Sequence, residues 1–513
     1  MATDYIRKIL DTSVYEVAIE TPLHHAKSLS ARLNNTVLLK REDLQPVHSF
    51  KLRGAYQKMA TLSEGERGRG VITASAGNHA QGVALAAQRM GMRAIIYMPL
   101  TTPRIKIDSV KKMGAKIVLE GDTYDEASAA ARARAKKENL IFVPPYDDPD
   151  VIAGQGTVAM EILHQHRKPI HAIFVPVGGG GLLAGVAAYV KFLRPTIKVI
   201  GVEADNSACL YEAMKAGKRV QLKSVGIFAD GVAVKQIGKE PFRIVQSLID
   251  DVILVTTDEL CAAIKDIFEE TRSLTEPAGA LAVAGMKKYI EKTGAVGETL
   301  VAINSGANVN FDRLRHIADR AEVGEHREAL VAIRIPEKAG SLARFCQALG
   351  KRSITEFDYR FQSHQEAVVL LGLSLKGAPS ERAELVAHFN THGFHCDDLT
   401  DNELVKLHVR YMVGGLAPEI RAERLVRLQI PERPGALLEL LQEMKGQWNI
   451  TLFHYRNVGL EYGRVLLGID DSENTGADFF KLLVQQGYEF TDETENTSYR
   501  LFLRPDQTSK GVS

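Results

Sequence analysis

Short runs of β-branched residues alternate with alanine-rich stretches from about residue 71 to residue 305. The runs have no polar side, which is typical of strands buried on both faces of a parallel sheet; they are Val71–Ala74, Ala94–Met98, Lys116–Leu119, Ala172–Val175, Lys198–Val202 and Leu300–Ile303. The stretches between them predict helices, as at Asn78–Met90, Asp125–Lys137 and Gly181–Leu193. This alternation predicts an α/β domain, with helices around mainly parallel sheets and ligands beyond the carboxyl ends of the strands.

The pattern changes after Asn310, and an internal repeat follows. Arg313–Arg327 is highly charged and predicts a connecting helix and linker. Beyond it, Ile335–Leu342 (IPEKAGSL) recurs as Ile430–Leu437 (IPERPGAL), 95 residues later. Ile354-Thr-Glu-Phe-Asp-Tyr-Arg360 also recurs 96 residues later as Ile450-Thr-Leu-Phe-His-Tyr-Arg456. Two matched blocks with nearly the same offset indicate a duplicated unit.

Each copy has the order strand, helix, strand, strand, helix, strand, which is that of a ferredoxin-like α+β unit. The first copy is predicted at Ala329–Ile335, Ser341–Leu349, Ile354–Phe361, Ala367–Ser374, Ser380–Thr391 and a last strand near Phe394. In the second copy, Arg464–Ile469 is predicted as the third strand and Tyr499–Leu503 as the last. Neither copy holds a cluster of histidines, cysteines or carboxylates suited to chemistry. The repeats are therefore expected to bind a small ligand or to form an interface.

These patterns divide the chain into a catalytic part and a repeated part. The expected boundaries are 1–312 for the catalytic domain, 313–327 for the linker, 328–402 and 423–504 for the two repeat domains, 403–422 for the segment between them and 505–513 for a polar tail.

Composition excludes several classes of protein. The 513 residues carry 64 Lys and Arg against 63 Asp and Glu, so a general nucleic-acid or membrane-surface binder is not expected. No apolar run approaches the roughly 18–20 residues of a membrane span, and the first residues lack a signal-peptide pattern. The four cysteines lie far apart, which argues against a disulfide or zinc framework and favours the cytoplasm.

Two segments before residue 80 contain candidate catalytic groups. Lys51, in Ser49-Phe-Lys-Leu-Arg-Gly54, lies at a helix start, where burial would lower its pKa and make its amine nucleophilic. On this segment alone, a surface lysine is the simpler interpretation. Ser75-Ala76-Gly77-Asn78-His79 follows a strand and opens a helix, so its N–H groups suit an anion such as a carboxylate. The alternatives are an ordinary helix cap and a core histidine.

Two further segments suit a phosphate and a heteroaromatic ring. Gly178, Gly179, Gly180 and Gly181, followed by Leu182, would form a phosphate cradle between a strand and a helix. The same glycines, with Ala184 and Glu203, fit a dinucleotide-binding pattern equally well. Ser305 follows another strand and could bond a ring nitrogen, although alone it indicates only a turn. Glu276-Pro-Ala-Gly-Ala280 indicates a helix start.

Taken together and in this order, the motifs resemble the fold-type II enzymes that use pyridoxal 5′-phosphate (PLP). More closely, essentially the whole chain from Val14 resembles the biosynthetic threonine dehydratase family. The repeated segments resemble its paired ACT-like domains, and Arg410–Gly415 between them is also similar. The resemblance implies that Lys51 joins PLP covalently and acts catalytically with Ser305, the partner of the pyridine nitrogen. It also implies that Asn78 bonds the phenolic oxygen, that Gly178 to Leu182 hold the phosphate, and that residues 75–79 face the substrate carboxylate.

The same resemblance implies conversion of L-threonine to 2-oxobutanoate and ammonia at the head of isoleucine synthesis. It further implies inhibition by isoleucine, countered by valine, and a homotetramer; no bound metal is expected. A dehydrogenase is rejected, because it would leave Lys51 and Ser305 without roles. A serine dehydratase or serine racemase remains an alternative, although these relatives typically lack two ACT-like copies. The other alternative is a non-catalytic amino-acid sensor, against which the presence of all four motifs argues.

Overall fold

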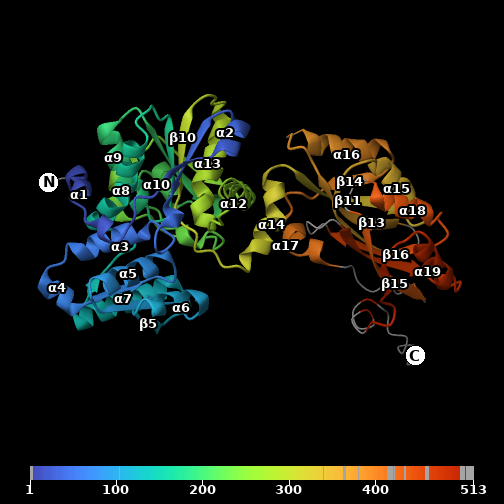
Figure 1. Ribbon diagram of the computed structural model, residues 1–513, viewed down its shortest axis with the longest axis horizontal. Helices are drawn as coiled ribbons and strands as arrows, with labels where there is room; N and C mark the ends of the chain where they lie inside the picture. The colour runs from blue at the N-terminus through green and yellow to red at the C-terminus, as the bar shows by residue number, and fades with distance from the viewer. Residues whose placement is uncertain are drawn as a thin grey trace. The chain divides into compact units, whose positions relative to one another are not determined.

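The computed structural model describes residues 4–102, 104–338, 340–361, 366–378, 380–412, 417, 420, 422–431, 435–456, 462–496, 499 and 503. It forms two compact units, Met1–Ala321 and Glu322–Ser513, which are coloured from blue to yellow and from yellow to red in Figure 1.

The first unit contains two sheets. The six-stranded sheet has the order β1 (Leu23–His25), β2 (Thr36–Arg41), β10 (Thr299–Asn304), β7 (Ala172–Pro176), β8 (Lys198–Ala204), β9 (Asp251–Val255). The four-stranded sheet has the order β5 (Lys116–Leu119), β4 (Ala94–Met98), β3 (Val71–Ala74), β6 (Ile141–Phe142). Every pair is parallel except β1 with β2. The six strands predicted from the sequence are all present, and the mainly parallel α/β fold is confirmed.

Helices cover both faces of each sheet, because alternate strand residues point to opposite sides. On β7, Ile173 and Val175 join an apolar core with α8 (Pro149–Gln165) and α9 (Gly181–Leu193). Ala172 and Phe174 join another core with α12 (Thr257–Thr271) and α13 (Pro277–Thr293). On the smaller sheet, α3 (Lys51–Ala60) and α5 (Asn78–Arg89) share a core with Val71, whereas α7 (Tyr124–Glu138) packs on Ile72.

Further helices complete the first unit. They are α1 (Tyr5–Leu10), α2 (Lys27–Leu33), α4 (Glu64–Arg69), α6 (Arg104–Lys112), α10 (Cys209–Ala216), α11 (Lys239–Leu248), α14 (Arg313–Gly324) and the 3₁₀ turns η1 (Val14–Glu16), η2 (Glu42–Leu44), η3 (Asp205–Ser207) and η4 (Asp230–Val232). The predicted connecting helix corresponds to α14, and α14 continues into the first residues of the second unit.

The second unit contains one antiparallel sheet, to which both repeats contribute strands. Repeat one contributes β11 (Glu328–Pro336), α15 (Ser341–Leu349), β12 (Ile354–Arg360), β13 (Glu366–Ser374), α16 (Glu381–Thr391) and β14 (His395–Asp398). Repeat two contributes β15 (Glu423–Pro431), α18 (Ala436–Glu443), β16 (Ile450–Arg456), β17 (Tyr462–Asp470), α19 (Gly476–Gln485) and β18 (Phe490–Asp492). The ferredoxin-like order is therefore confirmed in both copies. The segment between them holds α17 (Glu403–Leu407) and η5 (Val409–Tyr411).

The eight strands have the order β14-β11-β13-β12-β16-β17-β15-β18, so the repeats join edge to edge through β12 and β16. Phe357 lies opposite Tyr455 and Tyr359 opposite Phe453 in this antiparallel pair. Helices α15, α16, α18 and α19 cover one face through a single apolar core, and Val405 of α17 packs with Leu330 and Leu370 in a separate apolar cluster.

The last strand predicted at Tyr499–Leu503 is wrong at Tyr499 and Leu503, the two of its residues that the structure describes. The strand that closes the second repeat is β18, which pairs with β15. Tyr499 is helical, Leu503 lies in a turn, and the Leu503 N–H donates to the Tyr499 carbonyl at 2.9 Å. Both pack with Leu425 and Leu452. A short apolar run fits strand and helix equally, so the pattern alone could not distinguish them.

Parts of several predicted features lie outside the described residues. They are Ala339 and 432–434 of the repeated segments, 413–415 of the motif between the repeats, 500–502 and the tail 505–513.

Candidate active site

Lys51 is the first residue of α3, and its amine lies inside the first unit. Its Nζ donates a hydrogen bond to the Pro145 carbonyl at 3.0 Å and lies 5.2 Å from the centre of the Phe50 ring. Burial lowers the pKa of the Lys51 amine to about 8, and the negative charge of Glu276 opposes that shift. A substantial fraction of such an amine is neutral near physiological pH, as a nucleophile or a general base requires.

Ser305 is held next to this lysine. The Phe50 N–H donates to the Ser305 carbonyl at 3.2 Å, and Ser49 forms a β-bridge with Gly306. The Ser305 side chain is 3% exposed, and its hydroxyl donates to the Ala278 carbonyl at 3.3 Å. The structure therefore brings together two motifs that lie about 250 residues apart in the sequence.

Asn78 is the first residue of α5, and both the nitrogen and the oxygen of its side-chain amide form hydrogen bonds. Its Nδ2 donates to Glu276 Oε1 at 2.6 Å, and its Oδ1 accepts from Asn308 Nδ2 at 2.7 Å. Glu276 is 4% exposed and immediately precedes α13. The sequence indicated only a helix start at Glu276; an acidic residue before Pro277 gave no further signal of this contact.

The segment 75–79 offers fewer N–H groups to an anion than expected. The Ser75 N–H donates to the Tyr97 carbonyl at 3.0 Å, and the Gly77 N–H donates to Ser75 Oγ at 3.2 Å. Asn78 and His79 belong to the first turn of α5, where N–H groups have no partner within the helix. The Ala76 backbone N–H also makes no hydrogen bond within the described part of the chain. The N–H groups that remain for the predicted anion are therefore those of Ala76, Asn78 and His79.

The His79 ring belongs to the core, as the simpler interpretation held. Its Nε2 lies 3.0 Å from the Val143 carbonyl, which accepts its proton. Burial, with a smaller contribution from the charge of Lys51, lowers the pKa of His79 to about 3. The ring is therefore neutral at physiological pH and holds the start of α5 in place.

The glycine segment connects β7 to α9 in a space that admits no side chains. A Cβ at Gly179 would overlap the Tyr146 ring at 2.2 Å, and one at Gly178 would lie 2.9 Å from the Val232 backbone. Gly180 has φ of +87°, which favours glycine. The segment leads directly into the N-terminus of α9, where backbone N–H groups attract anions. These features fit a phosphate group.

A buried ion-pair network fixes α3 behind the site. Arg53 is fully buried, and its guanidinium bonds Glu42 from Nε and Nη2, both at 2.8 Å, and Glu161 from Nη1 at 2.6 Å. Its Nη1 also donates to Thr157 Oγ1 at 3.0 Å. Arg53 therefore ties the helix that begins at Lys51 to α8 and to the segment after β2.

Arg53→Ala is expected to lower the free energy of unfolding by about 3–5 kcal/mol, because the buried carboxylate of Glu42 loses its cationic partner and that of Glu161 keeps only Lys40. Chemical denaturation of the purified protein measures this change. Arg104→Ala is the matched control, since the Arg104 side chain is 93% exposed, and we expect it to change stability little. Equal stabilities of the two variants would contradict a structural role for the Arg53 network.

The motifs follow the carboxyl ends of three parallel strands. Ser75 follows β3, Gly178 follows β7 and Ser305 follows β10, as expected for ligand binding in α/β folds. Contacts through Phe50, Pro145, Tyr146 and Glu276 connect them around Lys51. A buried amine, a fixed amide donor, a phosphate cradle and a neutral hydroxyl fit the functional groups of PLP. Within the described residues, no group of three or more His, Cys, Asp or Glu side chains could hold a metal ion.

The chain belongs to the family of pyridoxal-phosphate dependent enzymes, whose sequence model matches residues 14–306. PLP is the cofactor of this family. Residues 319–409 and 415–503 each match the C-terminal regulatory domain of threonine dehydratase, so the two repeats are regulatory domains of that type.

Curated relatives cover nearly the whole chain. The chain is 55% identical over 503 residues to the biosynthetic L-threonine dehydratase of Burkholderia multivorans, with 98% of this chain and 99% of the relative covered. It is 52% identical over 500 residues to the corresponding Escherichia coli protein, with 98% and 97% covered.

Solved structures resemble about three fifths of the chain. The processed form of threonine deaminase isoform 2 from Solanum lycopersicum matches with a TM-score of 0.61 and 51% identity, over 62% of this chain and 92% of that one. Maize serine racemase matches with a TM-score of 0.58 and 29% identity, over 63% and 98%. No helix among the described residues is long and apolar enough to cross a membrane.

Proposed function

We propose that this chain converts L-threonine to 2-oxobutanoate and ammonia, the first step of isoleucine biosynthesis, under allosteric control. The observation that carries the proposal is that Lys51, Asn78, the glycine segment and Ser305 meet in one site, in a chain that also has two threonine dehydratase regulatory domains. Relatives about half identical over the whole length support threonine as the substrate.

When bound, PLP supplies an aldehyde that joins the substrate amine and a conjugated ring that withdraws electrons from the neighbouring carbon. We propose that Lys51 holds the cofactor and, once displaced by substrate, takes the Cα proton as general base. Its lowered pKa of about 8 suits that role at neutral pH. The N–H groups of Ala76, Asn78 and His79 would bind the substrate carboxylate at the start of α5.

The remaining residues hold and tune the cofactor. Gly178 to Leu182 would bind the phosphate, Asn78 would donate to the phenolic oxygen, and Ser305 would face the ring nitrogen. A serine hydroxyl, unlike a carboxylate, does not enforce a protonated ring, so the ring withdraws electrons less strongly. Elimination of the β-hydroxyl needs less of that withdrawal than transamination does, which favours the proposed reaction.

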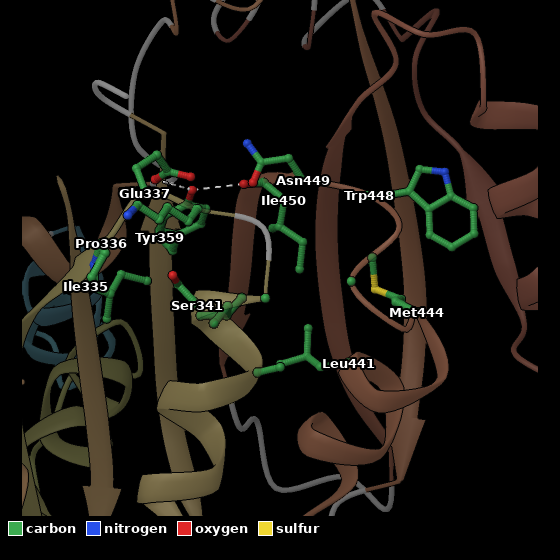
Figure 2. A pocket seen from close by; sticks show the side chains of 15 residues that line it. Ile335, Pro336, Glu337, Ser341, Tyr359, Leu441, Met444, Trp448, Asn449 and Ile450 are labelled. Carbon is green, nitrogen blue, oxygen red and sulfur yellow. Dashed lines mark hydrogen bonds between the residues drawn. The ribbon is translucent and has the colours of Figure 1, made fainter. Parts of the chain in front are cut away.

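We propose that isoleucine, and valine as its antagonist, bind a pocket between the two repeats (Figure 2). The pocket is open to solvent, and the space between its atoms, including that open solvent, is about 450 Å³. Repeat one lines it with Ile335–Lys338, Gly340–Ala343 and Tyr359, and repeat two with Leu441, Met444, Gly446 and Trp448–Ile450. Tyr359 joins the two walls, because its hydroxyl lies 2.8 Å from Glu337 Oε2 and 2.9 Å from the Ile450 carbonyl.

The chemistry of the pocket supports a branched aliphatic amino acid. Leu342, Leu441 and Met444 offer apolar contacts, whereas Glu337 and Lys338 carry charges opposite to those of an amino acid's ammonium and carboxylate. The family resemblance supports a homotetramer, which analytical ultracentrifugation tests.

The four cysteines are all free and buried, which suits the reducing cytoplasm as the location of the protein.

One assay tests the proposed function. The purified protein with PLP is supplied with L-threonine or L-serine, with and without isoleucine, and the keto acid released is identified. We expect 2-oxobutanoate from threonine, with release reduced by isoleucine. Faster pyruvate formation from serine would identify a serine dehydratase, D-serine would identify a racemase, and binding without turnover would identify a sensor.

A further inference from the structure

Glu276 is a buried carboxylate in the candidate site to which the proposed mechanism gives no role. Its backbone is fixed to the segment that carries Ser305, because the Glu276 N–H donates to the Gly306 carbonyl at 3.1 Å. The neighbouring Thr275 hydroxyl lies 2.7 Å from the same carbonyl. A Cβ at Gly306 would lie 2.5 Å from Glu276 Oε1, so the backbone passes directly against the carboxylate. The position of this carboxylate is therefore closely defined.

The carboxylate determines which way the Asn78 amide faces. An asparagine side chain has one acceptor oxygen and two N–H donors. In Asn78 the oxygen accepts from Asn308 Nδ2, and one N–H is donated to Glu276. Rotating the amide by 180° would place its oxygen against the carboxylate and its NH₂ group against the NH₂ group of Asn308. Both bonds would be lost, so one orientation is strongly favoured, with a single N–H left to donate.

Asn308 is fixed by the same carboxylate. Its backbone N–H donates to Glu276 Oε2 at 3.1 Å, and its side-chain Nδ2 also donates to the Val47 carbonyl at 2.8 Å. The two oxygens of Glu276 thus hold one asparagine directly and the other through its backbone. Asn78 and Asn308 lie 230 positions apart in the sequence, and both bond this carboxylate as well as each other.

Glu276 also acts electrostatically on Lys51. Its negative charge raises the pKa of the Lys51 amine against the effect of burial. Burial raises the pKa of Glu276 itself to about 7, and the negative charge of Asp230 adds to this effect. Three contacts lower this pKa in part: the hydrogen bond from Asn78, the positive charge of Lys106 and the hydrogen bond from Asn308. Lys106 and Asp230 form an ion pair at 2.5 Å, so they offset each other.

We propose that Glu276 is a positioning residue: it aims the remaining N–H of Asn78 at the phenolic oxygen of PLP, and its carboxylate stabilises positive charge on the nitrogen that joins Lys51 to the cofactor. This inference rests on the proposed attachment of PLP to Lys51. It predicts two separable effects, one on the geometry of Asn78 and one on the protonation of the Lys51 nitrogen.

Two substitutions separate these effects. Glu276→Gln keeps the reach of the side chain but removes its charge. We expect the pH midpoint of the visible absorbance of Lys51-bound PLP to fall by about one unit, because an opposite charge is lost. Glu276→Asp keeps the charge but is one methylene too short to reach Asn78. We expect its midpoint to stay near that of the wild type and its dissociation constant for PLP to rise about tenfold.

A double-substitution cycle tests whether the geometric effect passes through Asn78. In an Asn78→Ala background, adding Glu276→Asp should raise the PLP dissociation constant no further. Asp266→Asn is the control, because Asp266 is also a buried carboxylate of the first unit, but it pairs with Arg32 and Lys287 and no motif of the site includes it. Its pH midpoint and PLP dissociation constant should equal those of the wild type.

An unchanged midpoint in Glu276→Gln, or the same loss from Glu276→Asp with and without Asn78, would overturn the inference. If Glu276→Gln does not fold, the cycle with Glu276→Asp decides. Borohydride reduction and peptide mapping of the wild type show whether the proposed function fails or only the role proposed for Glu276. A reduced adduct away from Lys51 overturns the proposed function, whereas an adduct on Lys51 with unchanged variants overturns only the role of Glu276.

Discussion

Lys51→Ala is expected to reduce threonine turnover by about 10⁴-fold or more and to abolish the visible absorbance of bound PLP. The substitution removes the amine that would both join the cofactor and take the Cα proton, and a general base alone contributes up to about 10⁴-fold. Initial rates of 2-oxobutanoate release and the absorbance spectrum of the purified variant measure the two losses.

Lys58→Ala is the matched control on the same helix. Lys58 forms ion pairs with Asp148 at 2.8 Å and Asp150 at 3.3 Å, and no motif of the site includes it. We expect this variant to keep its absorbance and most of its turnover. A Lys51→Ala protein that retained both properties would remove this residue from the mechanism.

Removing residues from Arg327 onward is expected to leave a threonine dehydratase that isoleucine no longer inhibits. All residues proposed to bind cofactor and substrate lie in the first unit, which has its own apolar cores. The truncation keeps α14, and Arg320 in this helix remains paired with Asp258. Because allosteric coupling is typically about 1–3 kcal/mol, its loss is measurable by titrating threonine turnover with isoleucine.

A substitution in the full chain places the effector more narrowly. Ser341 lines the pocket between the repeats and is partly exposed, so Ser341→Trp should fill the pocket. We expect half-inhibition to need about tenfold more isoleucine, a change of about 1.4 kcal/mol. Gln347→Trp, at an exposed position of the same helix, is the control. Full inhibition of the truncated protein would instead place the effector site in the first unit.

Local patterns in the sequence were sufficient to predict most of the elements. The strand Lys116–Leu119 and the helices Gly181–Leu193 and Ser341–Leu349 have the predicted bounds. Hydrophobic period and turn residues determine such elements over a few residues, and both can be seen in one sequence. The same reasoning failed at Tyr499, where a short apolar run fits a helical turn and a strand equally well.

The candidate site was likewise predicted only in part from the sequence. The residue types and order of Lys51, Asn78, Gly178–Gly181 and Ser305 were sufficient to predict the PLP family, which the match over residues 14–306 confirmed. Glu276 could not be found in this way, because its importance comes from a contact with a residue 198 positions away. The use of the Ser75 and Gly77 N–H groups within the fold was equally invisible in the sequence.

The sequence by itself determined that this protein has an α/β unit with PLP-type motifs followed by two ferredoxin-like repeats, because periodicity, turn chemistry and internal repetition are local properties of the chain. Only the tertiary structure decided that the repeats join through β12 and β16 into one sheet, with the pocket between them. It alone also decided that one buried carboxylate holds two distant asparagines beside Lys51. Such contacts depend on how packed elements meet in space, which no local pattern specifies.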